Sequence, residues 1–507
     1  MKNLLKYIFV SALLFSVAGC DDFLNLEPKS QIGEGDFFQS QKDVEQAVTA
    51  CYNGLQAPIK DEWLLTELRT DNSRMRNLGS TSNRSVQIMQ YDEANFYSTD
   101  EALTSYWANS YKNIKNCHKV KQHLDLVTDD VLKKQYLGEI LFIRAYHYFN
   151  LVRLYKDVFA VTSLITADEA KGMSTTPTSE IYSEIIEKDL LEIIDNNYLP
   201  ASHVNEHKGR ITLYAAKTLL AKVYLTQKRY QEAQTQLLGV YGKDGLGLEK
   251  PYSRVFEIAN EMNKEILFAV RYFSGGYGIG NSFPYKFAAY NSLEAGLKGE
   301  GENYPTQSLV KSYDPADSRK EVTLRTTYLS GVKIQYDNSV NKYYSVVVLA
   351  DDGGNDWPIL RYSDVILMLA EIQNEIDGNP TNAFQYINQV RTRADLPELT
   401  TADCPDANSF RLAIENERRW EFAFENQRFF DLVRTDRFIP VMNEHFQTES
   451  YISNANTGDE AVDTMDNPNR SKFYWDNDNK RYKGYPMTAD RQSLPMPNDE
   501  TNVSSIY

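Results

Sequence analysis

The stretch LLAKVYLTQKRYQEA, residues 219–233, fixes the spacing of three side chains that decide how the surrounding chain folds. Ala221 is followed three positions later by an aromatic residue, Tyr224, and twelve positions later by a second alanine, Ala233. Small residues let two antiparallel helices approach closely, and the aromatic ring fills the groove beside them. The stretch therefore predicts two consecutive helices that pack against each other.

The same pattern recurs, and its spacing matches the tetratricopeptide consensus. IRAYHYF repeats it with Ala145 and Tyr148, and LMLAEIQNEIDGNPTNA repeats it with Ala370 and Ala383, with Gln373 in the aromatic position. The copies begin 76 and 149 residues apart (145 to 221, and 221 to 370), so insertions separate the helix pairs. We expect a mainly α fold with tetratricopeptide-like helix pairs as scaffold, large irregular loop-rich insertions and few short strands, rather than a regular solenoid.

Apolar residues at helical spacing divide the chain into a scaffold and irregular stretches. The pattern predicts helices over residues 41–55, 101–127, 132–157, 179–198, 212–241, 362–378, 381–395 and 409–437. Residues 56–100 and 242–358 break this rhythm. We expect one domain over 41–507, with a helical scaffold at about 41–241 and 359–437, a loop-rich ligand-side region at about 242–358 and an irregular tail over 438–507.

The N-terminus has the parts of a secretory signal. Lys2 and Lys6 form a basic start, and an apolar run too short to span a bilayer then leads to Cys20. VAGC resembles the bacterial lipobox, in which the cysteine is acylated. We predict a signal peptide over residues 1–19, lipidation of Cys20 and a tether over 20–40; an ordinary cleaved signal is the alternative.

Charge and cysteine usage limit the partners. The formal net charge of −16 repels phosphate backbones, so nucleic acid is not an expected partner. No later segment approaches the length of a membrane span, so membrane attachment is expected through lipid. The other cysteines, Cys51, Cys117 and Cys404, are odd in number and far apart. They are predicted to be small buried hydrophobic residues rather than a disulfide framework.

No motif indicates an enzyme, a cofactor or a metal site. HVNEH, residues 203–207, lacks the second-position Glu of a zinc-binding helix. In ENERRWEFAFENQRFFD, residues 415–431, Glu417, Glu421 and Glu425 lie four apart among three arginines. Rows of carboxylates can suggest glycoside hydrolysis. The arginines at helical distances favour instead an ion-pair network that ties helices together.

Several longer motifs follow one another along the chain. They are DFLNLEP (22–28), GEILFIRAYHYFNLVRLYKDVF (138–159), ENYPTQSLVKSYDPADSRK (302–320), RYSDVILMLAE (361–371), AFQYINQVRTRADL (383–396) and IENERRWEFAFENQRFFDLVR (414–434). Together with the lipobox, and in this order, they resemble the SusD/RagB family of outer-membrane nutrient-binding lipoproteins of Bacteroidota. The resemblance covers essentially the whole chain.

The resemblance implies a non-catalytic lipoprotein anchored to the outer membrane and facing the cell exterior. Such a protein captures oligosaccharides and delivers them to a partner SusC-like TonB-dependent transporter, against which the helix pairs would pack. It needs no cofactor. The same architecture binding peptides for uptake is the alternative, and spacing along the sequence does not identify the sugar.

The two irregular stretches supply candidate ligand-binding residues. Sugar sites combine exposed aromatic rings with Asn, Asp and Arg, because sugars have apolar faces and polar rims. In the family, an Asp at the position of Asp71 and aromatic residues in the following loop commonly line the glycan site. The candidates are Trp63, Asp71, Asn72, Arg74, Tyr91, Tyr272, Phe273, Tyr277, Asn281, Tyr285 and Tyr290.

Core packing is the alternative for these rings, and it is expected for half or more of them. Glycines beside the second group let rings stand out from the backbone. Trp107 lies within an amphipathic helix and Trp357 precedes Pro358, so both are expected to be structural.

Overall fold

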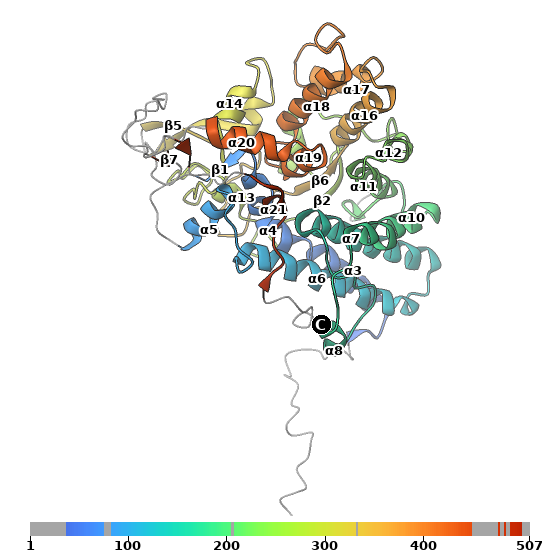
Figure 1. The fold of residues 1–507 in the computed structure, drawn as a ribbon. Coiled ribbons are helices and arrows are strands. Elements are labelled where there is room, and N and C mark those ends of the chain that lie inside the picture. Colours follow the sequence, from blue (N-terminus) through green and yellow to red (C-terminus); the bar gives the residue numbers. More distant parts are fainter. Residues whose placement is uncertain are drawn as a thin grey trace, which may run out of the picture.

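The computed structural model describes residues 37–75, 83–203, 207–330, 333–448, 475–476, 481–482 and 487–498. The predicted signal peptide, the lipidation site Cys20 and nearly all of the tether lie outside these ranges. Figure 1 shows helices stacked along one side of the molecule and a loop-rich part with short strands on the other side. This mainly helical architecture with few short strands confirms the predicted fold class.

Four helices begin the scaffold. They are α3 (Gln41–Asn53), α4 (Gln56–Leu65), α6 (Glu101–Gln122) and α7 (Asp130–Tyr155). Helices α3 and α6 pack on α7, and α4 packs on α6. The Asp129 carboxylate accepts the N–H groups of Val131 and Leu132 and so starts α7. Every residue from 138 to 152 is buried, which makes α7 a core helix. Trp107 of α6 is fully buried against it, as predicted.

The helix pairs predicted from the alanine spacing are present. Ala221 of α11 (Leu213–Thr226) and Ala233 of α12 (Tyr230–Leu238) are both fully buried where these helices pack together. Ala370 and Ala383 are likewise buried where α16 (Tyr362–Asp377) meets α17 (Phe384–Arg393). Gly378 then ends α16 with a φ of 65°, a left-handed conformation that glycine adopts without strain.

The structure has further helices, most of them short. They are α8 (Ala167–Lys171), α9 (Thr178–Ile181), a π-helical turn (Tyr182–Glu187), α10 (Lys188–Asp195), α13 (Phe283–Lys286), α14 (Gln307–Ser312), α15 (Lys320–Thr323), α18 (Ala407–Glu421), α19 (Arg428–Arg434) and α21 (Ala489–Gln492). The longest of this group is α18, with 15 residues. Short 3₁₀ turns cover Glu67–Arg69, Leu124–Leu126, Tyr252–Val255 and Ile258–Asn260.

The described strands form two-stranded antiparallel sheets that tie distant segments together. The pairs are β1 (Ser73–Arg74) with β3 (Tyr304–Pro305), β2 (Ile266–Val270) with β6 (Trp357–Arg361), β4 (Leu324–Ser330) with β5 (Lys333–Val340), and β7 (Trp475–Asp476) with β8 (Arg481–Tyr482). The β2–β6 pair brings the start of the loop-rich region next to the beginning of α16. Trp357 of β6 is buried, which confirms its structural role.

All three stretches predicted to be irregular contain helices, and 242–358 holds the short α13, α14 and α15. The stretch 56–100 holds α4 and α5 (Asn83–Asp92), and the tail holds α20 (Phe438–Thr448). In α4, Pro58 lies in the first turn, where its missing N–H needs no intrahelical partner. Ile59, Trp63, Leu64 and Leu65 are all buried, so tertiary packing rather than an amphipathic pattern supports this helix.

The main hydrophobic core runs through the molecule, from Val44 to Leu494. Cys51, Cys117 and Cys404 are free and buried, as predicted. Within the described ranges, no helix is both long and apolar enough to cross a bilayer.

Candidate functional site

Asp71, the candidate from the first irregular stretch with the clearest precedent in the family, is held inside the fold. Its carboxylate accepts hydrogen bonds from Nε of Arg428 at 2.8 Å and Nη2 of Arg428 at 3.0 Å, and Nη2 of Arg419 lies 3.0 Å away. Burial alone would raise the pKa of Asp71, but Arg419 and Arg428 hold this pKa well below its ordinary value. Both oxygens of the Asp71 carboxylate therefore bind arginines inside the protein.

Asn72 is also committed to internal contacts. Its amide nitrogen donates to Oε1 of Glu67 at 3.2 Å, and its amide oxygen accepts a hydrogen bond from Nε of Arg419 at 2.8 Å. Asn72 is fully buried and Asp71 is nearly so. The structure therefore corrects the prediction that these two side chains contact a ligand: they anchor the chain that leads to β1.

Arg74 and Tyr290 are far apart in sequence, and the structure brings them together. The β1–β3 pairing sets the Arg74 guanidinium over the ring of Tyr304, 5.6 Å from its centroid. The Tyr304 hydroxyl accepts the backbone N–H of Tyr290 at 2.7 Å. The ammonium of Lys298 lies 5.6 Å from the centroid of the half-buried Tyr290 ring. A ring and cationic groups thus meet near the end of β1.

Phe273 and Tyr277 stand out on a short hairpin over residues 273–279. The N–H of Phe273 donates to the carbonyl of Ile279 at 3.0 Å, which closes the hairpin. Its turn uses Gly275 and Gly276 at φ values of 114° and 79°, which other residues adopt only with strain. Phe273 is 60% exposed and Tyr277 is 70% exposed, with ring centroids 5.9 Å apart.

Asp352 fixes this hairpin to the body. Its carboxylate accepts the N–H of Gly275 at 3.0 Å and that of Gly276 at 2.9 Å. These two N–H groups hold the pKa of Asp352 below its ordinary value. The two exposed rings are therefore presented on an anchored turn.

The other candidate rings are packed in the interior. Trp63 is 1% exposed, with its ring centroid 5.3 Å from that of Phe287, and Tyr91 and Tyr272 are also buried in the main core. Tyr285 belongs to a small separate core beneath the loops. A ring without free surface offers no stacking face, so these four residues leave the candidate site.

Asn281 has a structural role as well. Its side chain donates to the carbonyl of Asn355 at 2.7 Å and accepts the N–H of Phe283 at 3.1 Å. These bonds fix the end of the hairpin segment to the 352–356 segment. Hydrophobic periodicity could not show which of the candidate residues are buried and which are exposed, because an irregular stretch has no repeat that assigns residues to one face.

Sequence reasoning missed a second exposed segment beside the hairpin. Tyr344 is 41% exposed, and Val346, Val348 and Leu349 are more exposed still. A methyl group of Leu349 lies 3.8 Å from where a Cβ on Gly276 would stand, so this segment adjoins the hairpin. The sequence signal for this segment is the apolar run KYYSVVVLA, residues 342–350, within the predicted loop-rich region. We call Phe273, Tyr277, Ile279, Tyr344, Val346, Val348 and Leu349 the loop face.

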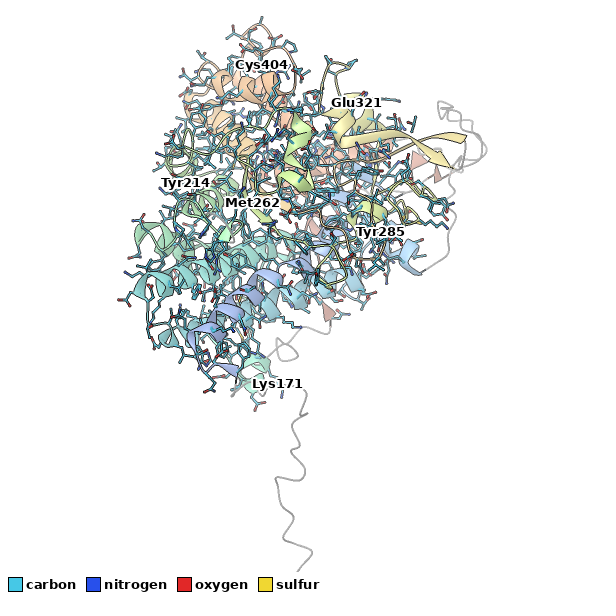
Figure 2. The ribbon with its side chains drawn as sticks, turned by 180° about the vertical axis from the view of Figure 1, so that it is seen from behind. Lys171, Tyr214, Met262, Tyr285, Glu321 and Cys404 are labelled. Atoms are coloured by element: carbon cyan, nitrogen blue, oxygen red, sulfur yellow. The ribbon has the colours of Figure 1, made fainter. Side chains whose placement is uncertain are left out.

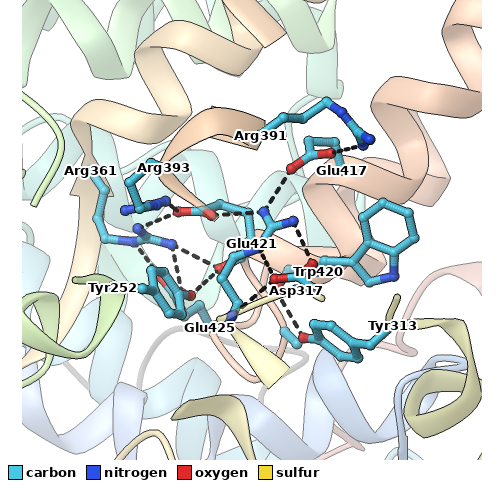
Figure 3. Close-up of polar contacts among 12 residues, drawn as sticks. Tyr252, Tyr313, Asp317, Arg361, Arg391, Arg393, Glu417, Trp420, Glu421 and Glu425 are labelled. Carbon is cyan, nitrogen blue, oxygen red and sulfur yellow. Dashed lines mark hydrogen bonds and ion pairs between the residues drawn. The ribbon is translucent and has the colours of Figure 1, made fainter. Parts of the chain in front are cut away.

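The charged stretch 415–431 forms the predicted ion-pair network (Figure 3). Nη1 of Arg361 binds Oε1 of Glu421 at 2.9 Å, and Nη2 of Arg393 binds the same oxygen at 2.5 Å. Nη1 of Arg319 binds the other oxygen of Glu421 at 3.1 Å. Burial alone would raise the pKa of Glu421, but the three arginines hold it well below its ordinary value. Glu425 binds Nε of Arg361 at 2.8 Å.

Each acid of this network is buried beside an arginine, so none is free to take part in acid–base chemistry. The network joins the loop-rich segments to α16, α17 and α18. Among the described residues, no group of three or more His, Cys, Asp or Glu side chains is arranged to hold a metal ion.

The fold is a scaffold of helix pairs, and its loop face presents exposed rings on an anchored hairpin. Residues 350–506 match the family described as "SusD family", and residues 22–225 match one described as "Starch-binding associating with outer membrane". A SusD-like protein P25 from Formosa agariphila is 26% identical, over 88% of this chain and 92% of the relative. A SusD-like protein from Bacteroides ovatus is 24% identical, over 87% of this chain and 84% of the relative.

Solved structures share the fold. A SusD-like protein from Bacteroides fragilis superposes with a TM-score of 0.74 at 22% identity, over 93% of this chain and 96% of that protein. Surface glycan-binding protein A from Bacteroides thetaiotaomicron, in complex with laminarihexaose, gives 0.71 at 20% identity, over 91% and 97%. A laminarin-binding SusD-like protein gives 0.70 at 24% identity, over 80% and 94%.

The chain belongs to the SusD/RagB family, which confirms the resemblance carried by the sequence motifs. Proteins of this family bind ligands and are not catalysts. The arrangement of the carboxylates agrees with that, since the network of Figure 3 is structural.

Proposed function

We propose that this protein is a cell-surface glycan-binding lipoprotein that captures oligosaccharides at the loop face and passes them to a TonB-dependent outer-membrane transporter. The observation that carries the proposal is the pair of exposed rings, Phe273 and Tyr277, on a hairpin anchored by Asp352. Rings held in place stack on sugar faces with little loss of conformational entropy. The laminarihexaose complex of a structural relative supports a glucan as the first ligand to test.

The second group around Tyr290 extends the proposed site. The exposed Lys298 offers hydrogen-bond donors beside the half-buried Tyr290 ring, a combination that suits sugars, whereas Arg74 is buried and contacts Tyr304. Binding of this kind needs only an affinity of about millimolar to micromolar, because cargo has to be released to the transporter. No proton transfer is involved.

Calorimetry tests the glycan proposal directly. Protein comprising residues 21–507 is titrated with laminarihexaose and with a panel of other plant, host and microbial oligosaccharides. We expect heat from at least one glycan. Changing both Phe273 and Tyr277 to Ala should lower the affinity about tenfold or more, if a sugar face stacks on these rings as nucleic-acid bases stack on aromatic side chains, where each base contributes roughly 1–3 kcal/mol. Tyr97→Ala, which truncates another exposed ring, is the matched control. No heat across the whole panel would refute glycan binding.

A peptide ligand is the second candidate, and one observation favours it. Val346, Val348 and Leu349 expose aliphatic side chains next to the rings, a surface better suited to apolar peptide side chains than to sugars. Pull-down from a proteolysate separates the two. Recovery of peptides that glycans do not displace would favour the peptide function.

A further inference from the structure

A cavity of about 420 Å³ lies away from the loop face, between the segment that precedes α11 and the segment that precedes β2. Its size falls within the range of about 300–1,000 Å³ of small-molecule sites. Tyr214 and Met262, which line it, are labelled in Figure 2, at a distance from Tyr285 of the loop-rich part. Neither Phe273 nor Tyr277 lines the cavity.

Both walls of the cavity are held by internal contacts. Arg210, on the first wall, donates to the carboxylate of Glu139 on α7 at 2.9 and 2.6 Å. Asn263, on the second wall, donates to the carbonyls of Val255 and Asn260 at 3.1 and 3.0 Å. The cavity is therefore formed before any ligand arrives, which reduces the ordering cost of binding.

The charges that line the cavity are mostly satisfied, with two exceptions. Arg210 is paired with Glu139, and Glu249 lies 3.4 Å from Nε of Arg254. Lys208 and Lys264 are exposed, and no carboxylate of the described residues lies within ion-pair distance of either ammonium. Two cations with no carboxylate partner in the described part of the chain thus share one cavity, in a protein whose net charge is −16.

The uncharged lining completes a surface suited to a sugar. Leu246, Met262 and Ile266 give apolar contact, and the Tyr214 phenol and the Ser202 hydroxyl supply polar groups. Apolar floor and hydroxyl partners fit a pyranose ring, while two ammonium groups fit carboxylates on that ring. We infer that this cavity is a second binding site, which takes an acidic saccharide carrying uronate carboxylates through Lys208 and Lys264.

Calorimetry with digalacturonate tests the inference, with its dimethyl ester as the neutral analogue of similar shape. We expect digalacturonate to bind with an affinity that falls as salt is added, and the ester to bind at least about tenfold more weakly, because charged hydrogen bonds are the stronger ones. The double variant Lys208→Gln/Lys264→Gln should lose affinity by a similar factor. Lys112→Gln/Lys134→Gln removes two exposed lysines outside the cavity and should bind as the wild type does.

A labelling experiment locates the ligand. Digalacturonate should protect Lys208 and Lys264 from acetylation by acetic anhydride, as read by mass spectrometry, and leave Lys112 and Lys134 unprotected. Absence of binding at about 10 mM digalacturonate, or equal affinity in both double variants, would overturn the inference. Citrate binding as tightly as digalacturonate would overturn the assignment to a saccharide.

The inference stands apart from glycan capture at the loop face. Phe273→Ala/Tyr277→Ala should leave digalacturonate binding unchanged, whereas Lys208→Gln/Lys264→Gln should leave binding of the loop-face glycan unchanged. Failure of one site is therefore distinguishable from failure of the other.

Discussion

The Arg428 guanidinium of α19 holds the Asp71 carboxylate through two hydrogen bonds, at 2.8 and 3.0 Å, although 357 residues separate them. This contact joins the segment leading to β1 with the C-terminal helices. The sequence could suggest a ligand-binding role for Asp71 because a polar residue in an irregular stretch has the same sequence pattern whether it binds a ligand or a distant arginine.

Removing Arg428 should destabilise the whole fold. Arg428→Ala leaves the Asp71 carboxylate buried with only part of its pairing, and loss of one partner of a buried ion pair costs about 3–5 kcal/mol. The expected result is a clear fall in Tm and in the urea midpoint. Arg411→Ala, which breaks an exposed pair with Glu375, should change stability by no more than about 1 kcal/mol. Equal effects of the two variants would show that the Asp71 contact is not structural.

Freeing the hairpin should weaken ligand binding without removing either ring. Asp352→Ala takes away the acceptor of the Gly275 and Gly276 N–H groups. We expect affinity for the loop-face ligand to fall several-fold, because binding must then order the hairpin, while Tm changes little. Asp168→Ala, at an exposed carboxylate of α8, is the control. Unchanged affinity in Asp352→Ala would mean that the rings need no anchoring.

Two buried histidines should make the protein sensitive to acid. Burial lowers the pKa of His147 to about 3 and that of His118 to about 4. Both are neutral in the fold and take up protons on unfolding below the ordinary pKa of about 6.5. Their contribution to stability is full above that pH and is lost as the pH falls towards 4, by about 1.4 kcal/mol per pH unit for each histidine.

Urea unfolding between pH 7 and 4 measures this contribution. His147 accepts a hydrogen bond from Asn113, with 2.9 Å between Nδ2 of Asn113 and Nε2 of His147, so the ring carries its proton on Nδ1. His147→Gln should lower stability at pH 7 but show a shallower fall in stability on acidification than the wild type does. Parallel curves for the two proteins would contradict a neutral buried His147.

Cys20 lies outside the described residues, and its lipidation stays a prediction. Cys20→Ala should move the protein from the membrane fraction to the soluble fraction, because acyl chains would be the means by which an acidic body is held at a membrane. Fractionation and labelling with radioactive palmitate measure this. Palmitate label that persists in Cys20→Ala would show that another residue is acylated and would contradict the prediction.

The sequence by itself determined the class of fold and the nature of its charged stretch. Ala221 and Ala233 require helices in close contact, and that constraint is local, so spacing alone reveals it. The carboxylates and arginines of residues 415–431 likewise indicated an ion-pair network, because both kinds of charge recur there at helical spacing. The arginines that bind Glu421, however, are Arg319, Arg361 and Arg393, which lie outside that stretch and are identified only by the tertiary structure.

Only the tertiary structure decided which candidate residues face solvent. Trp63 and Tyr277 are both aromatic residues in stretches predicted to be irregular, yet one is 1% exposed and the other 70%. The partners that make the difference, such as Phe287 for Trp63 and Asp352 for the hairpin under Tyr277, lie far away in sequence. Without a repeating pattern, burial depends on these long-range contacts, and the sequence carries no local signal for them.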